Sequence, residues 1–343
     1  MSVVVTRVTG HLARITLNRP QAINALTAEM VAIMRRALAG WASDDRVRTV
    51  LITGAGERGL CAGGDIRAIH ADAVSGGTAA LDFFADEYRL NATIAAYPKP
   101  VVAFMDGLVM GGGIGVSAHA SIRVVTERSR LAMPEVGIGM HPDVGGSWLL
   151  AHAPGELGTH LALTGTPVGA ADAIAAGLAD HHVASADLPR LAAALSERDA
   201  AEAVAAFAGA ATPGEFATAR AWIDDCYRGD SVRDIVARLA GHPEPGAQAA
   251  AKEIATRSPT ALTVTLRSLR SAATLPDLGA ALDQEYRLSA AMLRLPDLAE
   301  GIRAQIIDKD RRPRWRPATL AAVPGELVDA CFAPLADAPD LRG

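Results

Sequence analysis

The run Val109-Met110-Gly111-Gly112-Gly113-Ile114-Gly115 decides the fold of this chain. It follows an apolar segment, residues 100–105, that predicts a buried strand, and it opens an apolar segment, residues 114–120, that we expect to be helical. Glycines let a backbone approach a ligand closely and adopt dihedral angles closed to other residues. A helix N-terminus here would present free N–H groups to a negatively charged oxygen. The run is therefore a candidate oxyanion-binding turn.

A second run follows, Met133-Pro134-Glu135-Val136-Gly137-Ile138-Gly139-Met140-His141-Pro142-Asp143-Val144-Gly145-Gly146. Glu135 and Asp143 stand eight residues apart among Gly and Pro, a composition that predicts a loop. N–H donors followed by two carboxylates are what acyl chemistry needs, because the donors hold an oxyanion and the carboxylates handle protons.

Structural interpretations of both runs stay open. The glycines alone are compatible with a tight turn or close helix packing, and the two acids with capping or turn positions. Gly113-x-Gly115-x-x-Ala118 loosely matches the dinucleotide-binding fingerprint. That fingerprint starts at the end of a strand, whereas residues 106–112 intervene here, so we do not expect a dinucleotide site.

Composition limits the class of protein. A length of 343 residues predicts one large domain or two smaller ones. Half of the residues are hydrophobic but only 4% are aromatic, so the core must consist mainly of Ala, Val, Leu and Ile. A net charge of −5 without a long basic run argues against nucleic acid and anionic membranes as partners.

The cysteines and the hydropathy indicate a location. Cys61, Cys226 and Cys331 are odd in number and widely spaced, which favours a reducing compartment and argues against disulfides or a zinc site. Residues 1–18 match neither a secretory signal nor a transit peptide. The longest weakly polar stretch, residues 107–122, is too short to cross a bilayer. We therefore expect a soluble, cytoplasmic protein.

The first half of the chain alternates between strand and helix patterns. Helices are predicted at residues 27–41, with Thr27 as N-cap, and at 79–97, and a second glycine-bearing bend at 61–67 reopens into a helix. Strands are predicted at 3–8, 12–17, 47–53 and 100–105, and strands and helices continue to alternate through 124–125, 149–150 and 181–183. This alternation predicts an α/β fold.

The pattern changes after about residue 187, where Ala-rich helical segments take over. They cover residues 191–211, 216–227, 232–240, 247–256, a helix begun by Ser258-Pro259-Thr260, 278–293 and 297–307. We therefore divide the chain into an α/β core, residues 1–190, which carries the candidate site, and a mostly helical C-terminal region, residues 191–343.

Several motifs together resemble the crotonase (enoyl-CoA hydratase/isomerase) superfamily, and within it the 3-hydroxyisobutyryl-CoA hydrolase branch. The motifs are Asn18-Arg19-Pro20 with Asn24-Ala25-Leu26, Cys61-Ala62-Gly63-Gly64-Asp65-Ile66-Arg67, Met110-Gly111-Gly112-Gly113, Phe83-Phe84-x-x-Glu87-Tyr88, Met133-Pro134-Glu135, Pro142-Asp143-Val144-Gly145-Gly146 and Glu285-Tyr286-Arg287. The resemblance extends from residue 3 to residue 316. It implies a spiral of ββα units that ends in a helical region.

The resemblance also implies a site for a CoA thioester. The backbone N–H groups of Gly64 and Gly112 would hold the thioester oxygen, and losing one such donor typically costs about 3–4 kcal/mol of barrier. Members of the branch contact the acyl group at positions that correspond here to Glu87, Gly112, Glu135 and Asp143. CoA itself would contact Ala62, Gly64, Asp65 and Ile66.

One departure from the hydratases of the superfamily indicates the reaction. Hydratases carry a catalytic Glu where this chain has Gly115, and Gly where this chain has Asp143, while Glu135 occupies a shared position. The resemblance therefore implies hydrolysis of a short 3-hydroxyacyl-CoA, namely 3-hydroxyisobutyryl-CoA of valine breakdown. Glu135 would activate water or attack the thioester, and Asp143 would orient the substrate hydroxyl or the water.

Two alternatives remain beside the hydrolase. One is an enoyl-CoA hydratase or isomerase, which the missing carboxylate at Gly115 disfavours; the other is a catalytically silent CoA-binding homologue, for which the three acids would be superfluous. No metal or cofactor is expected beyond the CoA of the substrate, and homo-oligomerisation is left open. We expect Cys61 to be a packed core residue. His141 could tune the neighbouring acid or replace an apolar wall, and we favour the apolar wall.

Overall fold

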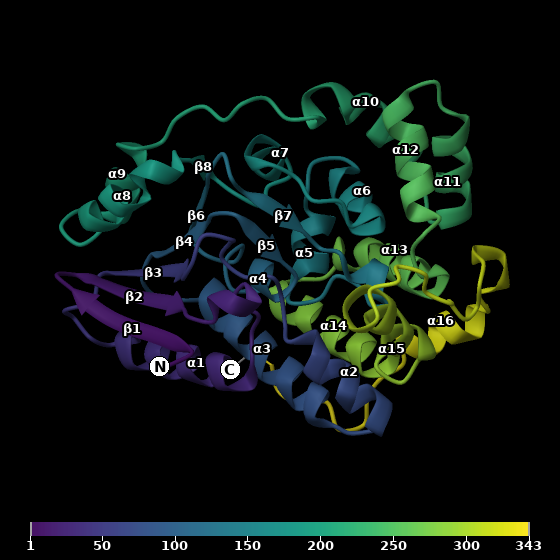
Figure 1. The fold of residues 1–343 in the computed structure, drawn as a ribbon, viewed down its shortest axis with the longest axis horizontal. Coiled ribbons are helices and arrows are strands. Elements are labelled where there is room, and N and C mark those ends of the chain that lie inside the picture. Colours follow the sequence, from purple (N-terminus) through teal and green to yellow (C-terminus); the bar gives the residue numbers. More distant parts are fainter. Residues whose placement is uncertain (1, 342–343) are drawn as a thin grey trace.

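The computed structural model describes residues 2–341, and a six-stranded sheet forms its centre (Figure 1). The strand order is β1-β2-β3-β4-β6-β8; β1 and β2 pair antiparallel and every other pairing is parallel. The bounds are β1 Val4–Thr9, β2 Leu12–Leu17, β3 Thr49–Gly54, β4 Val101–Met105, β6 Ile122–Val125 and β8 His181–His182. A small parallel sheet pairs β5 (Leu108–Met110) with β7 (Arg130–Ala132). The predicted α/β class is confirmed.

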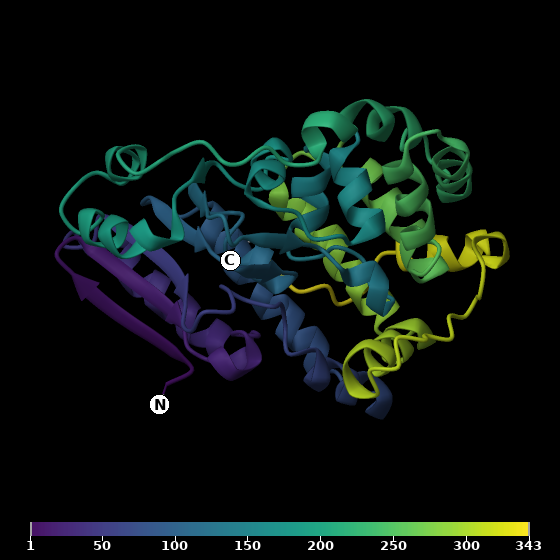
Figure 2. The ribbon, with the colours of Figure 1, turned by 45° about the horizontal axis from the view of Figure 1, so that its top comes forward.

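Two helices carry the N-terminal half of the core. They are α1 (Ala28–Ala42), which Thr27 caps by accepting a hydrogen bond from the Met30 N–H as predicted, and α3 (Ala79–Ala95). Strand residues that point to one side, such as Ile15 and Ile52, join the main core with these helices. Their neighbours on the other side, such as Leu51, belong to a second core under α8 (Leu188–Ala194) and α9 (Ala200–Ala205). Figure 2 shows α8 lying over the purple strands β1 and β2.

Two helix predictions are wrong in extent. The predicted helix at 114–120 is a single turn, α4 (Gly112–Gly115), followed by turns, because the chain must bend back toward β6. The predicted helix at 191–211 is broken into α8 and α9 at residues 195–199, where the Asp199 side chain caps α9. The α8 helix crosses residue 190, and the division into two domains stays a prediction.

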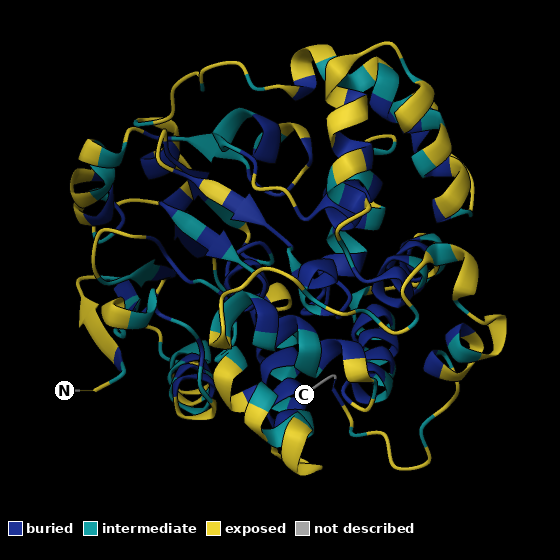
Figure 3. Ribbon diagram, turned by 45° about the vertical axis from the view of Figure 1, so that its right-hand side comes forward, coloured by how far each residue is buried: buried dark blue, intermediate teal, exposed yellow. Residues whose placement is uncertain are grey.

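The remaining helices include several that were predicted and four that were not, at residues 146–151, 157–164, 170–175 and 325–331. They are α2 Ile66–Ser75, α5 Gly146–Ala151, α6 Leu157–Thr164, α7 Ala170–Ala175, α10 Phe216–Cys226, α11 Val232–Gly241, α12 Pro245–Ile254, α13 Pro259–Ala272, α14 Leu278–Met292, α15 Pro296–Ile302 and α16 Gly325–Cys331. A π-helical turn, Arg303–Ile307, extends α15, and short 3-10 turns lie at Pro20–Ala22, Glu135–Ile138, Ser185–Asp187 and Leu320–Ala322. Figure 3 shows central helices buried on most sides and peripheral helices with one exposed face. Contacts of α13 with α5, and of α14 with α3, bring the C-terminal helices against the core.

Candidate active site

A cavity of about 410 Å³ opens between the two glycine bends, α3 and the Glu135–Ile138 turn. Most of the predicted site residues line it, and they are Ala62, Gly64, Ile66, Glu87, Gly112, Glu135 and Asp143. Asp65 does not line this cavity, because its carboxylate pairs with Arg19 at 3.2 Å. The structure therefore brings together every predicted site residue except Asp65.

Two free N–H groups meet in one corner of the cavity. Among the described residues, the N–H of neither Gly64 nor Gly112 donates a hydrogen bond. Gly112 begins α4 after Gly111, whose φ of +48° and ψ of −118° suit only glycine. A Cβ atom on Gly112 would lie 3.4 Å from the Gly64 nitrogen and would collide with Glu87 Oε1. The two donors thus converge beside a carboxyl group, and both positions face the cavity that a substrate oxygen would enter.

Glu87 reaches this corner from α3. Its side chain is 2% exposed, and its buried Oε1 has no hydrogen-bond partner among residues 2–341. Burial, and next the charge of nearby Asp143, raises the pKa of Glu87 well above its usual range. An unpartnered buried oxygen is costly, so this carboxyl group is arranged to meet a polar group of a ligand.

Glu135 lies at the start of the 3-10 turn Glu135–Ile138, where the sequence predicted a loop. Its Oε2 is buried without a partner in the described chain, and Oε1 lies 2.9 Å from the place of a Cβ on Gly111. Burial and then the charge of Asp143 raise the pKa of Glu135 well above its usual range. Glu135 therefore has a free oxygen at the N–H corner, as a proton acceptor or nucleophile requires.

Asp143 lies in the loop that leads to α5, as predicted. When Asp143 is ionised, the Tyr88 hydroxyl donates a 2.8 Å hydrogen bond to Oδ2. Burial raises the pKa of Asp143 to about 6, and the hydrogen bond from Tyr88 opposes that rise. Asp143 is thus held in a fixed orientation, unlike Glu135.

Tyr88 begins a buried polar chain that the sequence did not reveal. Its hydroxyl lies 2.8 Å from Ser289 Oγ on α14, and Ser289 Oγ lies 3.2 Å from His141 Nε2. His141 Nδ1 donates to the Pro142 carbonyl oxygen at 2.9 Å. His141 is therefore a hydrogen-bonded member of the site, and the expectation of a mere apolar replacement is wrong.

The protons available to this chain of hydrogen bonds can be counted. Burial lowers the pKa of His141 to about 4, so the ring is neutral at pH 7 and offers Nε2 as an acceptor. The four contacts Pro142–His141, His141–Ser289, Ser289–Tyr88 and Tyr88–Asp143 need four protons, and three side chains supply one each. A protonated Asp143 supplies the fourth. The neutral form of Asp143 therefore satisfies one more contact of this hydrogen-bond chain than the ionised form does, whereas the bond from Tyr88 to the ionised carboxylate favours ionisation.

Glu285 on α14 anchors the Asp143 loop. Its carboxylate accepts hydrogen bonds from the N–H groups of Gly145 at 2.6 Å and Ser147 at 2.9 Å, and from the Ser147 hydroxyl. Burial raises the pKa of Glu285 to about 8, and these donors oppose the rise. In the sequence, Glu285 stands out only as part of the Glu285-Tyr286-Arg287 motif. Glu285 has this role because the fold brings it close to the loop, although 138 to 140 residues separate them in the sequence.

Gly115 has no room for a side chain. It is buried, and a Cβ atom there would lie 2.7 Å from Val144 Cβ and 2.8 Å from Asn91 Nδ2. Real Cβ contacts are longer, so even alanine would displace a neighbour. The position at which the superfamily's hydratases carry their additional Glu is thus closed by packing in this protein.

One group among residues 2–341 has the donor atoms for a metal ion, formed by Asp225, Cys226 and His242. It lies at the end of α10 and after α11, and none of its members lines the cavity described above. Asp225 already pairs with Arg228 at 3.1 Å. The absence of a metal from the reaction stays a prediction.

The chain is similar to proteins of one known family along most of its length. The family model described as Enoyl-CoA hydratase/isomerase matches residues 12–332. The chain belongs to the enoyl-CoA hydratase/isomerase family. The mitochondrial 3-hydroxyisobutyryl-CoA hydrolase of Gallus gallus is 40% identical over 337 residues, 95% of this chain and 87% of that protein. The Homo sapiens protein of the same name is 38% identical over 94% of this chain and 86% of its own length.

Two solved structures share the fold closely. A carnitinyl-CoA dehydratase from Mycobacterium thermoresistibile superposes with a TM-score of 0.96 at 53% identity, covering 99% of this chain and 98% of that chain. An enoyl-CoA hydratase from Rhodobacter sphaeroides 2.4.1 superposes with a TM-score of 0.92 at 45% identity, covering 97% and 98%. The predicted crotonase-type fold is confirmed. No helix within residues 2–341 is long and apolar enough to cross a membrane.

Proposed function

We propose that the protein hydrolyses a short 3-hydroxyacyl-CoA thioester, most specifically 3-hydroxyisobutyryl-CoA, to CoA and the free 3-hydroxy acid. The observation that carries the proposal is the set of acids at the N–H corner: Glu135 and Asp143 are present, while packing closes Gly115. Curated relatives about 40% identical along most of the chain carry the name 3-hydroxyisobutyryl-CoA hydrolase.

Binding would begin at the two free N–H groups. The thioester oxygen would accept from Gly64 and Gly112, whose donors need no reorganisation as negative charge develops on that oxygen. The CoA part would run along Ala62, Gly64 and Ile66, which line the cavity, with Asp65 contributing only backbone atoms because its carboxylate pairs with Arg19.

Glu135 would carry the bond-breaking step. Its unpartnered Oε2 would either take a proton from an attacking water or attack the thioester carbon and form an anhydride that water then opens. Both routes need an ionised Glu135, and CoA leaves as the thiol once a proton reaches its sulfur. Because burial, and next the charge of Asp143, raises the pKa of Glu135, this carboxylate is a stronger base than an exposed glutamate.

Asp143 and Glu87 would recognise the substrate. Tyr88 fixes Asp143 in one orientation, and the raised pKa lets Asp143 either donate or accept a hydrogen bond with the 3-hydroxyl group. Glu87 Oε1 is free beside Gly112, at the point where the acyl chain would leave the oxyanion corner. We expect no metal or redox cofactor in this scheme.

The runner-up is hydration of an enoyl-CoA. Two close structural neighbours bear the names carnitinyl-CoA dehydratase and enoyl-CoA hydratase. Addition of water across an alkene in this superfamily uses a carboxylate at the position of Gly115, where the contacts with Val144 and Asn91 leave no space. Hydrolysis therefore fits the acids of this site better.

An assay that follows thiol release and enoyl absorbance in parallel distinguishes hydrolysis from hydration. Purified protein should release free thiol from 3-hydroxyisobutyryl-CoA rapidly and should hydrate crotonyl-CoA only feebly. Fast loss of enoyl absorbance without thiol release would overturn the hydrolase and favour the hydratase. Tight CoA-ester binding without turnover of either substrate would favour the silent homologue.

Two further proposals concern the setting of the protein. The three cysteines are all unpaired and buried, which suits a reducing compartment, and we propose the cytoplasm. The curated relatives, in contrast, are named as mitochondrial. Assembly into a homo-oligomer stays an open proposal that size measurement in solution would decide.

A further inference from the structure

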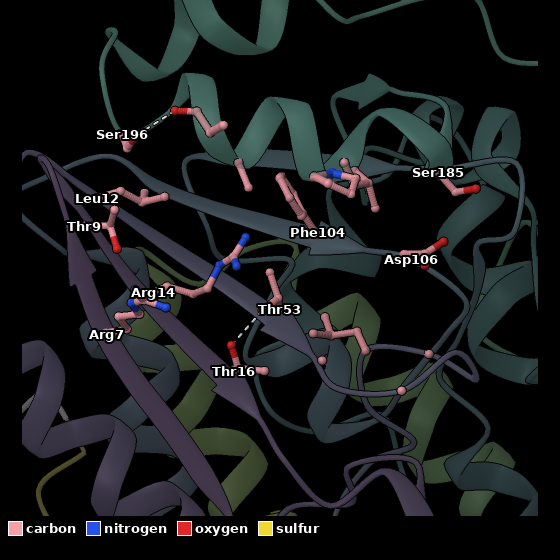
Figure 4. A pocket seen from close by; sticks show the side chains of 18 residues that line it. Arg7, Thr9, Leu12, Arg14, Thr16, Thr53, Phe104, Asp106, Ser185 and Ser196 are labelled. Carbon is pink, nitrogen blue, oxygen red and sulfur yellow. Dashed lines mark hydrogen bonds between the residues drawn. The ribbon is translucent and has the colours of Figure 1, made fainter.

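A second cavity, of about 650 Å³, lies on the other side of the six-stranded sheet from the acyl site (Figure 4). Its floor is formed by β1, β2 and β3, and its roof by α8. The outward strand residues Leu12, Arg14 and Thr16 line it, whereas Ala13, Ile15 and Leu17 point into the main core. This volume lies within the range of small-molecule sites. The proposed reaction uses none of its residues.

The roof is held at both ends, so the space is a built feature. At one end, the Ser196 carbonyl oxygen accepts from the His11 N–H in the β1–β2 turn at 3.2 Å. At the other end, the Ser185 N–H donates to Glu127 Oε2 at 3.0 Å, and the Ser185 hydroxyl also donates to Glu127. Between these anchors α8 spans the cavity without collapsing onto the floor.

Two arginines share the floor. Arg7 and Arg14 stand directly opposite each other in the β1–β2 ladder, a placement in which like charges repel. Within residues 2–341 neither forms an ion pair, and Arg14 Nε is buried without a hydrogen-bond partner. Burial, followed by the charge of Arg7, lowers the pKa of Arg14. Figure 4 shows the Arg14 side chain reaching from β2 toward α8.

The other polar groups of the cavity do not neutralise this charge. Asp106, across the cavity in Figure 4, accepts a 2.6 Å hydrogen bond from the Thr126 hydroxyl and lies 3.5 Å from Arg128 Nε. The Thr53 hydroxyl donates to the Ile15 carbonyl oxygen at 3.4 Å and lies 3.2 Å from the Thr16 hydroxyl, and the threonine hydroxyl groups of the cavity carry no charge. The two guanidinium groups thus face an open space without a counter-charge.

The remaining lining is apolar. It consists of Leu12, Leu60, Phe104, Leu188, Pro189 and Ala192. A ligand that fits both parts of the cavity needs a negatively charged end and an apolar body. Guanidinium groups bind carboxylates and phosphates through two parallel N–H bonds, which suits either kind of anionic end.

We propose that this cavity binds a small organic anion, a carboxylate or a phosphate monoester, with its charge at Arg7 and Arg14 and its apolar body under α8. The ligand neutralises two opposed cations and supplies the missing acceptor for Arg14 Nε. This site is separate from the acyl site, so it does not depend on the function proposed above.

Calorimetric titration of the protein without CoA tests the proposal, because the phosphate monoester of CoA would itself compete for this cavity; the arginine variants below separate binding here from binding at the acyl site. The probes are benzoate, phenyl phosphate and the uncharged benzyl alcohol. We expect one molecule of benzoate or phenyl phosphate to bind per chain and benzyl alcohol not to bind; the tighter anion identifies the preferred class. Arg14→Gln should weaken binding at least tenfold, and Arg36→Gln, an exposed charge on α1, should leave binding unchanged.

Three results would overturn the proposal. They are no binding of either anion to the wild-type chain, equal binding by Arg14→Gln and Arg36→Gln, and binding of benzyl alcohol as tight as that of benzoate. If Arg14→Gln fails to fold, Arg7→Gln replaces it, because Arg7 is exposed and its loss leaves no buried gap. Anion binding that Arg7→Gln leaves unchanged would count against the site.

Discussion

Glu135 and Asp143 enter the same cavity with different partners, and this difference separates their expected roles. Glu135 Oε2 is unpartnered among the described residues, whereas Asp143 is held by Tyr88. Glu135→Gln keeps the shape of the side chain but removes its basicity. We expect turnover to fall about 100-fold to 10,000-fold, the usual share of general-base catalysis, while the affinity for the CoA ester stays close to wild type. Steady-state kinetics and equilibrium binding measure the two quantities.

The matched control for Glu135→Gln is Glu57→Gln, which changes an exposed glutamate outside the cavity. Its turnover should equal that of the wild-type chain. Retention of more than half of the activity in Glu135→Gln would remove Glu135 from the bond-breaking step.

Asp143 is expected to recognise the 3-hydroxyl group of the substrate. A site built to bond a hydroxyl discriminates strongly against its absence, because a buried polar group is then left unpaired. Asp143→Gly should therefore erase the preference for 3-hydroxyisobutyryl-CoA over isobutyryl-CoA, and Asp143→Asn should keep part of it. The ratio of kcat/KM for the two esters measures the preference. An unchanged ratio in Asp143→Gly would show that Asp143 does not recognise the 3-hydroxyl group, and its role would then be to orient the water or to structure the loop.

At the scale of elements, the site depends on how closely α4 packs against the Asp143 loop. A Cβ on Gly115 would lie 2.7 Å from Val144 Cβ. Gly115→Ala should therefore destabilise the fold by about 1–3 kcal/mol through overpacking. A Cβ atom on Gly40, within α1, would have no neighbour within 4 Å. Gly40→Ala should therefore stabilise the fold by about 0.5–1 kcal/mol. Chemical denaturation measures both, and equal effects would contradict the tight packing at α4.

Ser289 joins α14 to α3 and to the Asp143 loop through the contacts with Tyr88 and His141. Ser289→Ala removes two contacts and one proton, so the protons of His141 and Tyr88 suffice for the remaining contacts. Asp143 then ionises more easily, and its pKa should fall from about 6. We expect the side-chain carboxyl carbon of Asp143, followed by NMR as the pH is varied, to titrate at lower pH in Ser289→Ala than in the wild-type chain. An Asp143 titration that stays in place or moves to higher pH would show that the hydrogen-bond chain does not control Asp143.

At the scale of the whole molecule, buried carboxyl groups make stability depend on pH. Burial raises the pKa of Glu285 to about 8, above the value of about 4.3 of an unfolded chain. The folded protein therefore holds a proton that the unfolded chain has lost. The associated stability is fully present below the unfolded pKa and is lost as pH rises through about 8. Glu87, Glu135 and Asp143 act in the same direction.

Glu285→Gln removes one of these groups and keeps an oxygen that accepts from Gly145 or Ser147. Between pH 6 and pH 9, we expect the Tm of the wild-type chain to fall more steeply than that of Glu285→Gln. Thermal denaturation across this range measures the two slopes. Parallel curves would show that Glu285 is already ionised at pH 6.

The sequence by itself determined the features that depend on neighbouring residues. The glycine bends at 61–67 and 109–115, the Thr27 cap and the helical periodicity from 216 onward were predicted with small errors at their ends, because turns, caps and periodicity are local. The resemblance then pointed to Glu87, Glu135 and Asp143. The helix predicted at 114–120 failed because local propensity could not anticipate the return of the chain toward β6.

Only the tertiary structure decided which distant side chains share protons and charge. Ser289 meets His141 across 148 residues, and that contact turns an isolated histidine into a partner of Asp143. Likewise, the sequence shows two arginines in a hairpin, but only the position of α8 makes them line one cavity without a counter-charge, with Arg14 half-buried and Arg7 exposed. Burial sets the pKa of each group and removes its water, and burial depends on how the whole chain packs.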